Sequence, residues 1–125
     1  MPVRSLTSSV LRWPDAGVVD RAIRAWALGL THQRADVLGI AYIGSYARGD
    51  WGVGSDLDLV VVVEQSEEPF WNRASELDLG GFPVPTEGIV YTASEWRALA
   101  EERGRFFRTV EQEGVWLYRA PRWEG

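Results

Sequence analysis

Two aspartates on alternate positions, Asp56 and Asp58, lead into a run of four valines over residues 60–63. Four consecutive valines indicate a strand that is buried on both faces. Because side chains alternate along a strand, the two carboxylates point the same way and lie about 7 Å apart. Carboxylate oxygens are the ligands that hard divalent cations prefer. The pair therefore predicts a site for one or two such cations at the start of the strand.

A Gly-Ser pair, Gly44 and Ser45, precedes the aspartates and follows an apolar run over residues 37–43. The run predicts a strand, and the pair predicts a turn with little side-chain bulk at the end of that strand. Backbone N–H groups that are left free in such a turn can bind a phosphate. The stretch therefore combines a candidate phosphate-binding turn with a candidate metal site.

This stretch resembles the signature of the minimal nucleotidyltransferases, which belong to the DNA polymerase beta-like nucleotidyltransferase superfamily. The glycine, the serine and both acids fall at the family's spacing. The residues that carry the resemblance are Gly44-Ser45, Ala47-Arg48-Gly49 and Ser55-Asp56-Leu57-Asp58-Leu59. It extends over nearly the whole chain, because the capped helix expected after Thr92 and the final run over residues 113–118 also resemble the family.

The superfamily usually has a third carboxylate, commonly an aspartate, on the strand after the two aspartates. Glu87 opens the matching run in this chain. The resemblance implies that Asp56, Asp58 and Glu87 bind Mg²⁺, with Mn²⁺ as an alternative, and that Glu87 helps to deprotonate an acceptor hydroxyl. Glutamate departs from the family pattern, since its carboxylate lies one methylene further from the backbone. A surface glutamate on an edge strand is the alternative interpretation.

The resemblance also implies that Gly44 and Ser45 hold the outer phosphates of a nucleoside triphosphate. In the family, the segment that contains Arg48 helps to shape the nucleotide cleft. Arg48 could orient a phosphate, or it could form an ion pair with Asp50 or another acid, and the sequence leaves both roles open. His32 is the sole histidine, so a histidine metal cluster is excluded.

Composition limits the classes of protein that this chain can belong to. Its 125 residues fit one domain over residues 1–125, with an N-terminal arm at 1–13. A net charge of −5 argues against non-specific nucleic acid binding, which needs a cationic face. No apolar run approaches the ~20 residues of a membrane span, so we expect a cytoplasmic protein. With no lysine in the chain, cationic phosphate binding would fall to its arginines.

Hydrophobic periodicity and turn residues predict the remaining elements. We expect helices at about 15–34, 70–79 and 105–113, a helical turn at 46–50, and strands at 37–43, 58–64, 87–91 and 115–118. A further helix is expected to start at a capping box formed by Thr92 and Glu95. This order predicts a mixed α/β domain with a single mixed sheet and helices packed mainly on one face. The resemblance implies that this domain has the nucleotidyltransferase fold.

The leading functional hypothesis is transfer of a nucleoside monophosphate, AMP from ATP, to an acceptor hydroxyl. The resemblance implies that the acceptor lies on a separately encoded helical partner of the HEPN type, with this chain as the antitoxin of a toxin–antitoxin-like pair. A catalytically weak module that binds and neutralises such a partner is one alternative, and a small-molecule nucleotidyltransferase is another. A homodimer stays open, and no membrane partner is expected.

Overall fold

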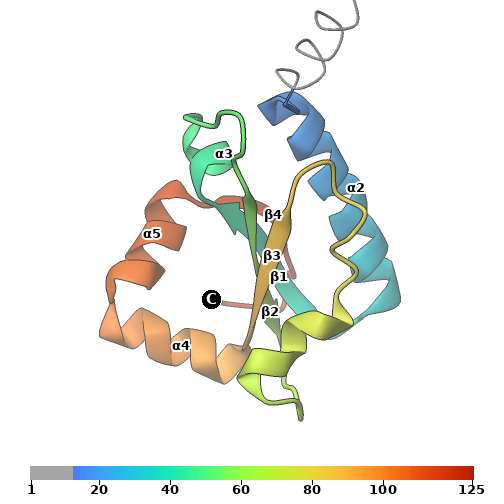
Figure 1. The fold of residues 1–125 in the computed structure, drawn as a ribbon. Coiled ribbons are helices and arrows are strands. Elements are labelled where there is room, and N and C mark those ends of the chain that lie inside the picture. Colours follow the sequence, from blue (N-terminus) through green and yellow to red (C-terminus); the bar gives the residue numbers. More distant parts are fainter. Residues whose placement is uncertain (1–12) are drawn as a thin grey trace, which may run out of the picture.

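The computed structural model describes residues 13–125, which fold into one sheet flanked by helices (Figure 1). The elements in chain order are α2 (Ala16–Gln33), β1 (Val37–Ile43), α3 (Ser45–Arg48), β2 (Leu57–Val63), η1 (Phe70–Glu76), β3 (Thr86–Thr92), α4 (Ala93–Glu102), α5 (Arg105–Glu113) and β4 (Val115–Arg119). Except for Trp13, the arm predicted at residues 1–13 lies outside the described residues.

Each of the elements predicted from the sequence is present, and most ends agree to within two residues. The capping box is confirmed, because the Thr92 hydroxyl accepts the Glu95 N–H and the Glu95 carboxylate accepts the Thr92 N–H. The helix expected at 70–79 is instead a shorter 3₁₀-helix, η1. Trp71, near the start of this short helix, is 84% exposed.

The sheet has the order β3-β2-β1-β4. Strand β1 pairs in antiparallel fashion with β2 and β4, whereas β2 and β3 are parallel. The predicted single mixed sheet is therefore confirmed. Because β2 occupies an inner position, the residues at its start have neighbours on both sides, from the end of β1 and from the start of β3.

Helices cover both faces of the sheet, with α2 on one face and α4 and α5 on the other (Figure 1). We predicted that they would pack mainly on one face, and that detail is wrong. The physical reason lies in β2, where Val60 to Val63 are all 0% exposed. Val61 and Val63 pack on the side of α2, while Val60 and Val62 pack against Trp96 and Phe107. Four consecutive apolar residues require apolar cover on both faces.

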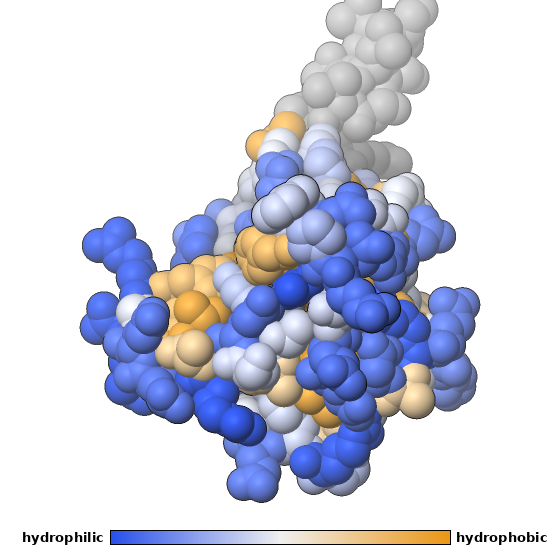
Figure 2. All heavy atoms as spheres, turned by 90° about the horizontal axis from the view of Figure 1, so that it is seen from below, coloured by the Kyte–Doolittle hydropathy of each residue, from blue (hydrophilic) through white to orange (hydrophobic). Residues whose placement is uncertain are grey.

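The surface around η1 and α4 is mostly hydrophilic, with hydrophobic residues gathered in separate patches (Figure 2). The large hydrophobic side chains that stay exposed in the described residues are Val18, Leu28, Val53, Phe70 and Trp71. Trp96, by contrast, is only 3% exposed, so the tryptophans divide between core and surface. Within residues 13–125, no helix is both long enough and apolar enough to cross a membrane.

A buried arginine, Arg73, fixes η1 to the sheet and to α4. Its guanidinium donates to both carboxylate oxygens of Glu95, at 2.6 and 3.1 Å, and to the carbonyl oxygens of Val90 and Glu68, at 3.2 and 3.0 Å. Glu95 is at the same time the capping residue of α4. The Arg73 hydrogen bond is the main cause that lowers the Glu95 pKa. One side chain thus joins three elements.

Replacing Arg73 by glutamine should destabilise the protein by ~2–3 kcal/mol, because charge-assisted hydrogen bonds are lost and Glu95 keeps no cationic partner there. Urea unfolding measures this. Since the Glu95 pKa is depressed in the folded state, its contribution is present above the unfolded pKa of about 4.3 and is lost as the pH falls. Arg73→Gln should therefore unfold with a weaker dependence on pH in that range. The exposed Arg105→Gln is the matched control, and equal stability of the two variants would contradict the anchoring role.

Candidate active site

Three carboxylates predicted from the sequence occupy neighbouring positions at one end of the sheet. Asp58 is the register partner of Ile43 in β1 and of Glu87 in the parallel strand β3. Partners in a parallel pair lie about 4.8 Å apart and present their side chains to the same face. Asp56 lies two residues before Asp58, just ahead of the first residue of β2, and alternation places it on the same side. All three belong to the face that α4 and α5 cover further along the sheet.

The electrostatics of Asp58 reflect this arrangement. Its pKa is raised above the usual value, first because burial disfavours the charged form, and then because the carboxylates of Glu87 and Asp56 repel it. Asp58 is half-buried, whereas Asp56 and Glu87 are exposed. Of the three carboxylates, Asp58 is therefore the one that is both partly removed from solvent and repelled by its neighbours.

The predicted phosphate-binding turn approaches Asp58 directly. Gly44 has φ 93° and ψ −161°, a conformation that is essentially restricted to glycine. A Cβ atom at this position would lie 2.9 Å from Oδ2 of Asp58. Glycine at position 44 is thus required both by the backbone and by the carboxylate beside it.

Ser45 begins α3, directly after Gly44. The side-chain hydrogen bonds of this segment within the described residues use Tyr46, Arg48 and Ser55, and the Ser45 hydroxyl takes part in none of them. It is therefore available to donate to a ligand oxygen. The structure thus brings Gly44, Ser45 and Asp58 together at the junction of β1 and β2.

Arg48 lies at the end of α3 and is held by two carboxylates. Its Nε donates to Oδ2 of Asp50 at 3.2 Å, and its Nη1 lies 3.7 Å from Oε1 of Glu113, the last residue of α5. The second distance is that of an ion pair without a hydrogen bond. Sequence reasoning gave Asp50 as a partner but did not find Glu113, because nothing in a helix-terminal glutamate indicates which distant arginine it meets.

The donor atoms at this end of the sheet suit a hard cation, since all three side chains supply carboxylate oxygens. Within residues 13–125, however, no group of three or more His, Cys, Asp and Glu side chains is gathered closely enough to hold a metal ion. Like charges repel one another, which favours separated side chains where no cation neutralises them. The residues fit a cation by type and by backbone position, and cation binding would require their side chains to turn toward one another.

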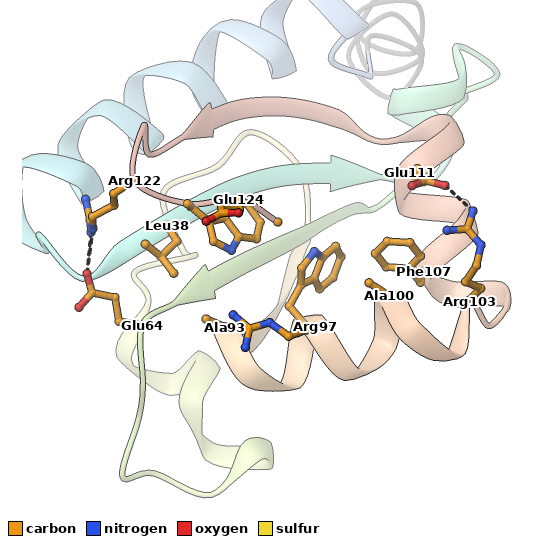
Figure 3. Close-up of a pocket in the computed structure, with 13 residues that line it drawn as sticks. Leu38, Glu64, Ala93, Arg97, Ala100, Arg103, Phe107, Glu111, Arg122 and Glu124 are labelled. Carbon is orange, nitrogen blue, oxygen red and sulfur yellow. Dashed lines mark hydrogen bonds and ion pairs between the residues drawn. The ribbon is translucent and has the colours of Figure 1, made fainter.

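A separate hollow of about 870 Å³ lies between α4, α5 and the C-terminal segment (Figure 3). Leu38, Trp96, Phe107 and Arg97 are among the residues that line it, and two ion pairs, Arg122–Glu64 and Arg103–Glu111, lie at its borders. None of the site residues predicted from the sequence lines this hollow. Glu64 follows the C-terminal end of β2, so the hollow and the carboxylates belong to opposite ends of that strand.

Replacing Asp58 by asparagine should stabilise the metal-free protein at neutral pH, because it removes a charge that burial and two neighbouring carboxylates disfavour. A carboxyl with a raised folded pKa contributes stability that is fully present below its unfolded pKa, about 3.9, and that is lost as the pH rises through the folded value. The melting temperature of Asp58→Asn should therefore exceed that of the wild type at pH 7 in EDTA, and the difference should vanish in acid. Asp78→Asn, at an exposed position, should show no such difference. A lower melting temperature for Asp58→Asn at pH 7 would contradict this account of the charge.

The model of the nucleotidyltransferase domain family matches residues 28–113, a segment that contains the Gly44–Ser45 turn and all three carboxylates. No curated protein matches the sequence.

Two solved structures share the fold. One, from Sulfolobus solfataricus, is described as a candidate nucleotidyltransferase; it is 18% identical, with a TM-score of 0.57 over 83% of each chain. The other is a toxin–antitoxin structure with AMP-PNP, 16% identical, with a TM-score of 0.53 over 78% of this chain and 74% of that one. At such identities the likeness concerns the fold alone, whereas the family match spans more than half of the chain. This protein belongs to the nucleotidyltransferase domain family.

Proposed function

We propose that this protein transfers AMP from ATP to a hydroxyl group of an acceptor. The observation that supports this most directly is the position of Asp58, which lies beside the Gly44 turn on one side and Glu87 on the other. A phosphate-binding turn and three carboxylates then share one end of the sheet. Nucleotidyl transfer needs both features, because a triphosphate has to be held and its negative charge has to be offset.

In this proposal, Asp56, Asp58 and Glu87 hold divalent cations, Mg²⁺ or Mn²⁺, through their carboxylate oxygens. Such cations, when bound, neutralise charge on the triphosphate and stabilise the transition state of an in-line displacement. The residue types and backbone positions suit this role. The raised pKa of Asp58 supports it too, since a cation would relieve the repulsion that raises it.

Gly44 and Ser45 would bind the outer phosphates, with the Ser45 hydroxyl donating to a phosphate oxygen. The acceptor hydroxyl attacks the α-phosphorus, its proton passes to Glu87, and the bond between the α-phosphorus and the bridging oxygen of the β-phosphate breaks. Pyrophosphate leaves, and AMP stays on the acceptor as a phosphodiester. The protein contributes mainly position and charge, as expected for phosphoryl chemistry.

We further propose that the acceptor lies on a helical protein partner of the HEPN type, with this chain as the antitoxin of the pair. The structural likeness to a protein of a toxin–antitoxin structure with AMP-PNP supports a partner of this kind and a nucleotide ligand. The second candidate is a binding module that neutralises such a partner without transfer. The exposed Trp71 favours this alternative, because tryptophan is enriched at the energetic centres of protein interfaces.

ATP labelled on the α-phosphate separates the two candidates. Incubated with Mg²⁺ and a co-purified HEPN-type protein, the wild type should transfer this label to the protein, whereas ATP labelled on the γ-phosphate should release its label as pyrophosphate. Asp58→Asn should lower transfer by at least about a hundredfold, in the range reported for loss of one charge-stabilising group, and EDTA should abolish it. Asp78→Asn should transfer normally. Equal transfer by Asp58→Asn in EDTA would rule out the metal-dependent reaction.

Glu87 can be tested by two substitutions that differ in length and charge. Glu87→Gln should reduce both the rise in melting temperature caused by Mg²⁺ and the rate of transfer, because a neutral amide is a weaker ligand and cannot accept the acceptor proton. Glu87→Asp should keep or increase transfer, since it introduces the residue that is common in the superfamily. If Glu87→Gln changes neither quantity, Glu87 is a surface residue of β3, and the binding-module candidate is the better one.

A further inference from the structure

The end of α5 contains a carboxylate oxygen that the fold buries without a hydrogen bond. In the described residues, Oε1 of Glu113 is buried and has no hydrogen-bond partner, although the side chain as a whole is 37% exposed. Its nearest cation is the guanidinium of Arg48, with Nη1 at 3.7 Å. A buried charge needs a compensating partner, so Arg48 is the group that makes this position tolerable for Glu113.

Glu113 itself is held firmly. Phe107 and Val110 of α5 are buried against the sheet, at 9% and 0% exposure. Gly114 makes the turn from α5 into β4 so tight that a Cβ atom there would clash with the Val110 carbonyl oxygen. Val115 then pairs with Tyr42 of β1. The backbone of Glu113 is thus fixed near the end of β1, where the Gly44 turn begins.

The segment that carries Arg48 has little structure of its own. Helix α3 has four residues, and it is held on its other side by Tyr46, whose hydroxyl donates to the Pro14 carbonyl oxygen at 2.9 Å. The pair with Asp50 lies within the same segment, two residues along the chain, and cannot join α3 to another element. Among the ion pairs of the described residues, the one with Glu113 is the contact through which Arg48 reaches α5.

We propose that Arg48 and Glu113 are positioning residues: their ion pair joins α3 to α5 and holds the Gly44–Ser45 turn against Asp58. This rests on the proposed function in one respect, namely that the turn binds a triphosphate. Arg48 then serves the site through the turn and does not itself contact the phosphates. Of the two roles that the sequence left open for Arg48, the geometry points to the ion pair, because its guanidinium already pairs with two carboxylates.

The first test needs no nucleotide. Two amides report on α3, since the Arg48 N–H bonds to the Gly44 carbonyl oxygen at 3.0 Å and the Gly49 N–H bonds to that of Ser45 at 2.9 Å. Hydrogen exchange at these amides, measured by NMR, should be about two- to fivefold faster in Glu113→Gln, as expected for loss of one partly exposed pair. Asp50→Asn is the matched control and should leave exchange close to that of the wild type. Unchanged exchange in Glu113→Gln would overturn the proposal.

The second test measures binding of AMP-PNP by calorimetry in the presence of Mg²⁺. Glu113→Gln and Arg48→Gln should weaken binding by similar factors, and the double variant should be no weaker than either, because both remove the same pair. The reversal Arg48→Glu with Glu113→Arg should restore part of the affinity, and Arg48→Lys should keep part of it. A much larger loss for Arg48→Gln than for Glu113→Gln, with no recovery in the reversal, would show that Arg48 binds phosphate and would overturn the proposal.

The two tests also separate this proposal from the proposed function. A wild-type protein that binds no AMP-PNP would overturn the assignment of the turn to a triphosphate, while the exchange measurement would still decide whether the pair holds α3. Faster exchange together with unchanged AMP-PNP affinity in Glu113→Gln would leave the pair a structural contact only and would overturn its role in positioning the site.

Discussion

At the start of strand β2 the chain passes from two carboxylates into a fully buried core within a few residues, and the rest of the structure depends on that transition. Val60 to Val63 are 0% exposed and are covered by α2 on one face and by α4 and α5 on the other. Burying a valine side chain stabilises a fold by about 1.5–2 kcal/mol, so this run fixes the register of β2 strongly. Asp58 cannot move along the strand without moving the valines, and it therefore stays opposite Glu87 and beside Gly44.

That fixed position has an electrostatic cost. Burial and two neighbouring carboxylates raise the pKa of Asp58, which means that its charged form is disfavoured in the folded protein. Stability is commonly given up at sites where function needs an unfavourable arrangement of charge. A ligand that binds the folded state alone returns the lost stability through mass action, and a divalent cation at these carboxylates would do so. The same charges that destabilise the fold without a cation would then favour binding of the cation.

Local pattern predicted much of the fold, while the family resemblance supplied the candidate site residues, whose roles stay predictions. The four valines predicted a strand buried on both faces, and alternation placed Asp56 and Asp58 together. The family resemblance singled out Glu87, and the structure places it in register with Asp58, although its role as a ligand stays a prediction. The expectation of helices mainly on one face was wrong, because a strand of four consecutive buried valines needs apolar cover on both of its faces.

What the sequence could not supply are contacts between residues that are distant along the chain. Arg73 meets Glu95 across 22 positions, and the sequence shows only an arginine on a short helix and a glutamate in a capping box. Arg48 and Glu113 belong to different elements that β1 and β4 bring together. Such pairs arise from tertiary packing, so they cannot be predicted from the periodicity within a segment.

Diffraction from crystals grown with Mn²⁺ and AMP-PNP tests the central claim most directly, because the anomalous signal of manganese locates the cation independently of any assumed ligand. We predict a manganese peak within ligand distance of the carboxylate oxygens of Asp56 and Asp58, with Glu87 turned toward it and the triphosphate against Gly44 and Ser45. An ordered nucleotide whose manganese is bound by other residues, with the three carboxylates still apart, would contradict the account.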